Sequence, residues 1–95
     1  MKLYHLTPDS NCGSITTLGL LLSKSRTVPP YVFLVPKIAV RQQSKHVAAR
    51  HTWDPDKVAT YEVEVPRGWL ERYASNVWRC DRDIGPERLV LLNRR

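Results

Sequence analysis

The residues best suited to chemistry lie close to the N-terminus, at the expected junction between a strand and a helix. The pattern predicts a strand over Lys2–Leu6 that carries His5, followed by Thr7 as the N-cap of a helix. Pro8 suits the first helical position, and Asp9 suits the positive end of the helix dipole. An imidazole, a hydroxyl and free backbone amides would then meet at one point, which favours binding of a nucleotide or a phosphate.

The helix that follows is expected to pack through one apolar face and to end at a glycine. Cys12, Ile15 and Leu18 recur at spacings of three, which places them on one side of a helix. Gly19 stands where a left-handed C-terminal cap belongs. We therefore expect a short helix between the first strand and the apolar run at residues 20–22.

Two strands and a second helix are predicted for the middle of the chain. Tyr31–Val35 is an almost wholly apolar run typical of a buried strand. Lys37–His51 has the spacing of an amphipathic helix with a basic outer face. Lys57–Val65 alternates apolar and polar residues and is the clearest strand in the sequence.

The C-terminal part is expected to add a helical turn at residues 68–73 and two more strands. The strands are predicted over Asn76–Cys80 and Arg88–Leu92. The order of elements, with two helices and about five strands, indicates a small single α+β domain over residues 1–95.

The composition points to an anionic partner and to no membrane. The net charge is +6, which suits a nucleic acid or a dinucleotide and disfavours a basic partner. No apolar run approaches the roughly 20 residues of a membrane span, and no signal peptide is visible, so a cytoplasmic location is expected.

No metal site is predicted. His46 and His51 are five residues apart, whereas two ligands on one helix face are expected four apart. Cys12 and Cys80 have no metal-ligand spacing, and two buried thiols are favoured over a disulfide between them, which stays the alternative.

Four short motifs resemble the ADP-ribosyltransferase-like superfamily, with the nearest likeness to RNA 2'-phosphotransferases and DarT-type DNA ADP-ribosyltransferases. They are YH-x-T at residues 4–7, GL at 19–20, VFLV at 32–35 and IGPERL at 84–89. The resemblance implies two helices against a split, mostly antiparallel sheet. It departs from the family pattern at Val35, where a serine is usual.

The resemblance also implies roles for individual residues, with NAD as a substrate. His5 would bind the ribose, its imidazole donating a hydrogen bond to a hydroxyl or phosphate, and Thr7 would also contact the ligand. Tyr31 would stack on the nicotinamide ring, and Glu87 would be the catalytic acid that stabilises an oxocarbenium-like transition state. The alternatives are a structural His5, a core Tyr31, and a solvated Glu87 paired with Arg88.

Two functions from different classes follow. The first is a minimal ADP-ribosyltransferase-like protein that binds NAD and passes ADP-ribose to a nucleic acid or an acidic protein. The second is a catalytically inactive small basic module, encoded for instance by a phage or a toxin system, that binds a nucleotide, a nucleic acid or a partner protein. Convergence of His5 and Glu87 on one cleft would favour the enzyme.

Overall fold

The computed structural model describes residues 1–25, 27–50 and 53–93. The predicted helix that ends at His51 therefore falls partly outside the described residues. Within these ranges the helices are α1 (Cys12–Leu18) and α2 (Val40–Arg50), and the strands are β1 (Lys2–Pro8), β2 (Val32–Leu34), β3 (Val58–Glu64), β4 (Leu70–Ala74), β5 (Val77–Cys80) and β6 (Leu89–Asn93).

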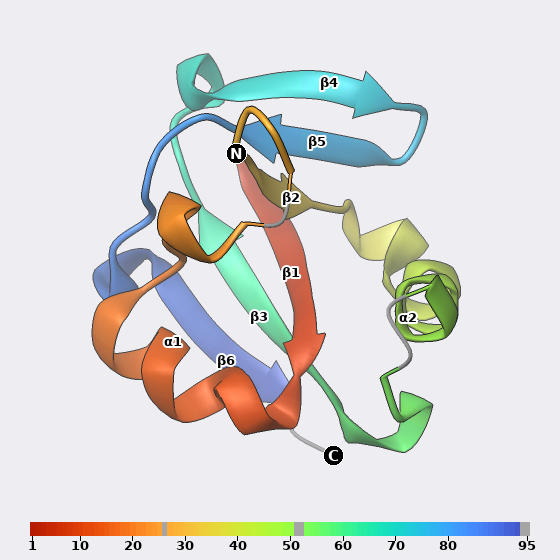
Figure 1. Ribbon diagram of the computed structural model, residues 1–95. Coiled ribbons are helices and arrows are strands. Elements are labelled where there is room, and N and C mark those ends of the chain that lie inside the picture. The colour runs from red at the N-terminus through yellow and green to blue at the C-terminus, as the bar shows by residue number, and fades with distance from the viewer. Residues whose placement is uncertain (26, 51–52, 94–95) are drawn as a thin grey trace.

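The strands form two antiparallel three-stranded sheets, ordered β1-β3-β6 and β2-β5-β4. A single bridge joins them, because the amides of Tyr4 and Val35 each donate to the other's carbonyl at 2.8 Å. The strands therefore follow the order β4-β5-β2-β1-β3-β6, with a break between β1 and β2 (Figure 1). The predicted α+β domain with two helices and antiparallel sheets is confirmed at this level.

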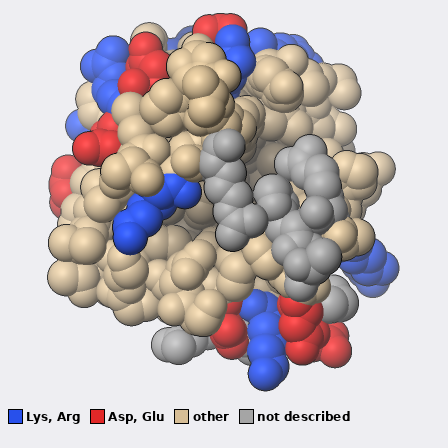
Figure 2. Space-filling view, viewed as in Figure 1, with Lys and Arg blue, Asp and Glu red and all other residues tan. Residues whose placement is uncertain are grey.

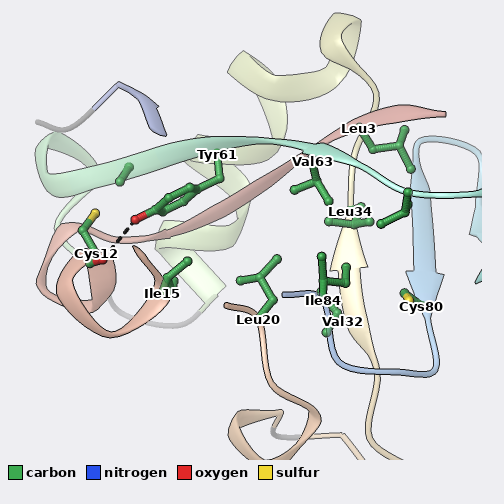
Figure 3. Close-up of a cluster of buried hydrophobic side chains, with 12 residues drawn as sticks. Leu3, Cys12, Ile15, Leu20, Val32, Leu34, Tyr61, Val63, Cys80 and Ile84 are labelled. Carbon is green, nitrogen blue, oxygen red and sulfur yellow. Dashed lines mark hydrogen bonds between the residues drawn. The ribbon is translucent and has the colours of Figure 1, made fainter. Parts of the chain in front are cut away.

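The main core lies between α1 and the inner faces of both sheets (Figure 3). The alternation predicted for β3 is confirmed, since Ala59, Tyr61 and Val63 are buried. The hydroxyl of Tyr61 donates to the carbonyl of Cys12 at 3.1 Å and lies 2.9 Å from Oγ1 of Thr16. These bonds satisfy a polar group that would otherwise be costly to bury.

A second, smaller core covers the opposite face of β1. Tyr4 and Leu6 point there and pack with Val35, Ala48 and Val58. Because successive side chains of a strand point to opposite faces, β1 is packed on both sides. The outer face of α2 is exposed and basic, as predicted, and among the described residues no helix is long and apolar enough to cross a membrane.

Gly19 ends α1 with a positive φ of 85°, which confirms its predicted role as a cap. Its amide donates to the carbonyl of Ile15 at 2.8 Å. A Cβ at this position would lie 2.1 Å from the carbonyl oxygen of Ile84, so the chain passes too closely for any side chain. The next residue, Leu20, then pairs with Ile84 through two backbone hydrogen bonds.

The predicted helix start at Thr7 is wrong. The β1–β3 ladder continues through Thr7 to Pro8, so Thr7 is a strand residue paired with Ala59. A 3₁₀ turn over Asp9–Asn11 follows without a side-chain cap, and α1 begins only at Cys12. The ladder hydrogen bonds of a buried strand outweigh a local capping preference.

The predicted helical turn at residues 68–73 is also wrong for most of its length. A 3₁₀ turn covers only Arg67–Trp69, and β4 then runs from Leu70 to Ala74 along the edge of the second sheet. Four of its five residues are exposed, so it lacks the apolar alternation by which a strand is recognised in a sequence. Cys12 and Cys80, by contrast, are both free and buried, as predicted.

Candidate functional site

His5 lies in the middle of β1, next to the break between the sheets. Its Nδ1 is 3.0 Å from the carbonyl oxygen of Phe33 on β2. Because a carbonyl can only accept, Nδ1 must carry the hydrogen and donate it. Burial lowers the pKa of His5, and the hydrogen bond to Phe33 offsets only part of that effect, so the folded structure favours the neutral ring.

This tautomer decides what His5 can offer a ligand. With Nδ1 protonated and the ring neutral, Nε2 is an acceptor. No group of the described residues hydrogen-bonds Nε2, and the side chain is partly exposed. His5 can therefore accept a hydrogen bond from a ligand hydroxyl at neutral pH. The donor role expected from the sequence is reversed.

Tyr31 lies immediately before β2, two residues before Phe33 and so roughly 7 Å from it along an extended chain. It is half-buried, with the guanidinium of Arg79 4.1 Å from its ring centroid and the ring of Phe33 6.3 Å away. β2 therefore carries the carbonyl that holds His5, and Tyr31 immediately precedes this strand. Tyr31 and Phe33 alternate with the core residues Val32 and Leu34, whereas His5 is on the same face of β1 as the core residue Leu3, so the structure does not place the side chains of His5 and Tyr31 on one face.

A small cavity of about 170 Å³ opens beside Tyr31. Its wall is formed by the residue before β2, by the 3₁₀ turn and first residues of β4, and by the end of β5, through Tyr31, Gly68, Trp69, Leu70, Glu71, Arg79 and Asp81. Typical small-molecule pockets have roughly 300–1,000 Å³. This cavity is therefore suited to one ring of a dinucleotide rather than to the whole molecule.

Arg79 is the central charged group of the cavity. Its Nη2 donates to Oε1 of Glu71 at 2.5 Å, a contact that raises the pKa of the guanidinium further and keeps it protonated. A second ring, that of Tyr73, lies 5.1 Å from the guanidinium carbon. Nε of Arg79 is buried and has no hydrogen-bond partner among the described residues. A buried donor of this kind is costly unless a ligand supplies an acceptor.

Thr7 is 3% exposed and lies two residues after His5 on the same face of β1. Its Oγ1 accepts a hydrogen bond from Nδ2 of Asn11 at 3.0 Å. The hydroxyl thus links the end of β1 to the 3₁₀ turn that precedes α1.

Glu87 is exposed on the 3₁₀ turn that leads into β6. The register places Leu89 opposite Val63, and Val63 opposite Leu3. Glu87 is therefore two strands away from β1 and beyond its first residues, roughly 15 Å from His5 by strand geometry. The structure does not bring Glu87 and His5 together.

No family model matches this chain, and neither a curated protein nor a solved structure is significantly similar to it. The site must therefore be argued from its geometry. Among the described residues, no three His, Cys, Asp or Glu side chains form a metal-binding group. His51, one of the two helix histidines considered above, lies outside the described part of the chain.

The sequence reasoning did not single out Glu71, Arg79 and Asp81. Arg79 lies in the strand predicted over Asn76–Cys80, but nothing in the sequence showed that its side chain would meet Tyr31. Glu71 was hidden in a segment predicted as a helical turn. The signal for Arg79 was its position in an otherwise apolar strand, VWRC, where a charge requires a partner.

Proposed function

We propose that this chain is a minimal ADP-ribosyltransferase-like domain that binds the nicotinamide ribose end of NAD beside the break between its two sheets. The observation that carries the proposal is the cavity beside Tyr31, where Glu71 supplies a carboxylate and the buried Nε of Arg79 has no hydrogen-bond partner among the described residues. The division of the antiparallel strands into two sheets supports the proposal, because the superfamily that the sequence motifs resemble has a split sheet.

Each group of the site has a function in this proposal. Tyr31 provides an aromatic surface for the nicotinamide ring. The unpartnered Nε of Arg79 is a donor for the carboxamide oxygen. His5 does not line this cavity, and the proposal assigns its Nε2 a hydrogen bond from a ribose hydroxyl because of the resemblance at residues 4–7.

The carboxylate that serves the reaction is Glu71 in this proposal. Loss of nicotinamide leaves positive charge on the ribose, which a nearby carboxylate stabilises. Glu71 lines the cavity and is held by Arg79, whereas Glu87 stands apart from His5 on an exposed turn. Glu87 remains the carboxylate favoured by the sequence motif, and the two assignments can be separated by experiment.

A second candidate function is binding without catalysis. The separation of Glu87 from His5 favours it, because the motif's own carboxylate would then have no part in the site. In that case the cavity would hold a nucleotide, and NAD would be bound but not cleaved.

Calorimetry with NAD tests the binding step. We expect His5→Ala to weaken binding at least tenfold, because Nε2 is lost, and His46→Ala, a change at an exposed histidine of α2, to leave it unchanged. Absence of binding by the wild type at millimolar NAD would overturn both candidate functions at this cavity.

Release of nicotinamide tests the chemical step. We expect Glu71→Gln to abolish release and Glu87→Gln to retain it. The reverse result would return the catalytic role to Glu87. Binding by the wild type without any release would favour the non-catalytic module.

A further inference from the structure

The whole net charge of the protein comes from one continuous segment of the chain. Residues 10–53 contain six Lys and Arg and no Asp or Glu, whereas the rest of the chain contains nine of each. Three of the six cations, Lys37, Arg41 and Lys45, lie along the 3₁₀ turn Lys37–Ala39 and α2, and all three are exposed. At the right of Figure 2, where Figure 1 places α2, Lys and Arg atoms are visible with no Asp or Glu atoms beside them. We name these three residues the α2 cation row.

The α2 cation row has no counter-charge on the protein. No carboxylate of the described residues lies within ion-pair distance of any of its members. Arg41 and Lys45 are four residues apart on one helix, so they are neighbours that repel each other. The first turn of α2 holds no acidic residue, although a carboxylate there would suit the positive end of the helix dipole. The stability of the helix therefore does not explain the row.

An apolar side chain stands beside these cations. Ile38 is 90% exposed, although burial of an aliphatic side chain of this size is favourable. An open pocket of about 640 Å³ is lined, among the described residues, by Ile38, Arg41, Gln42, Lys45 and His46. None of these is a Phe, Tyr or Trp, on which the bases of a single-stranded nucleic acid would stack. The pocket thus offers cations and an aliphatic contact, a combination that suits a peptide with carboxylates and an apolar side chain.

The helix is a firm support for such a partner. Ala39 and Ala48 are buried in the second core, where they pack with residues of β1 and β3, so the opposite face of α2 stays open. We propose that this open face binds an acidic segment of a partner protein, with carboxylates on the α2 cation row and an aliphatic side chain over Ile38. Carboxylates four residues apart on a partner helix are about 6 Å apart along its axis, which matches the spacing of Arg41 and Lys45. The pocket shares no residue with the cavity beside Tyr31, so this inference does not depend on the proposed function.

Fluorescence anisotropy with a labelled synthetic peptide tests the inference. The probe is an alanine-based helical peptide with glutamates at intervals of four residues and leucines beside them, and its control has the same composition in scrambled order. We expect the ordered peptide to bind about tenfold more tightly than the scrambled one at 50 mM salt, because only its carboxylates match the row. Its affinity should fall about tenfold between 50 and 500 mM salt, since the cations are exposed.

Two variants separate the contributions of charge and apolar contact. Arg41→Gln/Lys45→Gln should weaken binding of the ordered peptide about tenfold, and Ile38→Ser about fivefold. The matched control is Lys24→Gln/Arg67→Gln, which removes the same charge from exposed residues outside α2 and should change the affinity by less than about twofold. The urea midpoint of Arg41→Gln/Lys45→Gln should be equal to that of the wild type or higher, because like charges are removed. Unfolding would then not explain its loss of binding.

Four outcomes would overturn the inference. The first is absence of binding of the ordered peptide at millimolar concentration. The second is equal binding of the ordered and scrambled peptides, and the third is an equal loss in the two double variants, each of which would indicate net charge alone. The fourth is tighter binding of a single-stranded thymidylate 12-mer than of the ordered peptide, lost in Arg41→Gln/Lys45→Gln, which would assign this face to a nucleic acid.

Discussion

Replacement of Gly19 by alanine is the sharpest test of the fold. Gly19 has φ 85° and ψ −165°, a backbone conformation that is essentially restricted to glycine. An added Cβ would lie 2.1 Å from the carbonyl oxygen of Ile84, and because that atom belongs to the backbone it cannot rotate away. The chain must therefore move at the point where Leu20 pairs with Ile84.

The cost can be worked out from these contacts. A non-glycine residue in this conformation costs about 1–3 kcal/mol. The two backbone hydrogen bonds between Leu20 and Ile84, at 2.8 and 2.9 Å, contribute about 0.5–1.5 kcal/mol each and are lost if the segments separate. Gly19→Ala should thus lower the free energy of unfolding by about 2–6 kcal/mol, out of the roughly 5–15 kcal/mol typical of a domain.

Urea unfolding followed by circular dichroism measures this change. The control is Gly13→Ala within α1, where an added Cβ meets nothing within 4 Å. Alanine favours a helix over glycine by about 0.8–1 kcal/mol, so this variant should be at least as stable as the wild type. A loss below 1 kcal/mol for Gly19→Ala, or an equal loss for Gly13→Ala, would refute the close approach between Gly19 and Ile84.

Three further outcomes are expected. Because burial lowers the pKa of His5, the folded state favours its neutral form. Its contribution to stability is therefore complete above about pH 6.5 and is lost as the pH falls further. The difference between the urea midpoints at pH 7.5 and pH 5.5 should be smaller in His5→Gln than in the wild type. Tyr61→Phe should cost about 1–3 kcal/mol in urea unfolding, because the buried hydroxyl bonds to Cys12 and Thr16; an unchanged midpoint would contradict that bond network. Both cysteines are buried, and burial raises the pKa of the Cys80 thiol. Both should therefore be shielded from a thiol reagent in the native protein and react on unfolding, and rapid native labelling of both would contradict their burial.

Strong local patterns allowed much of the fold to be predicted. β3 was recognised because one of its faces is apolar over its whole length, and α2 because its apolar and basic residues recur at helical spacing. Gly19 was recognised because a glycine after an apolar helix face is typical of a C-terminal cap. β4 was missed because an exposed edge strand needs no apolar alternation, and its pairing with β5 is a tertiary contact.

The features of the candidate site also divide into those that the sequence predicted and those that depend on tertiary contacts. The sequence alone determined the strand that carries His5, and it predicted the strand at residues 32–34 although Tyr31, which it included, lies just before that strand. Only the tertiary structure decided that β2 would lie beside β1, that the carbonyl of Phe33 would select the tautomer of His5, and that Arg79 would meet Tyr31. It also placed Glu87 two strands away from His5. The physical reason is that strand pairing joins residues far apart in the chain, and no local propensity encodes which edges will meet.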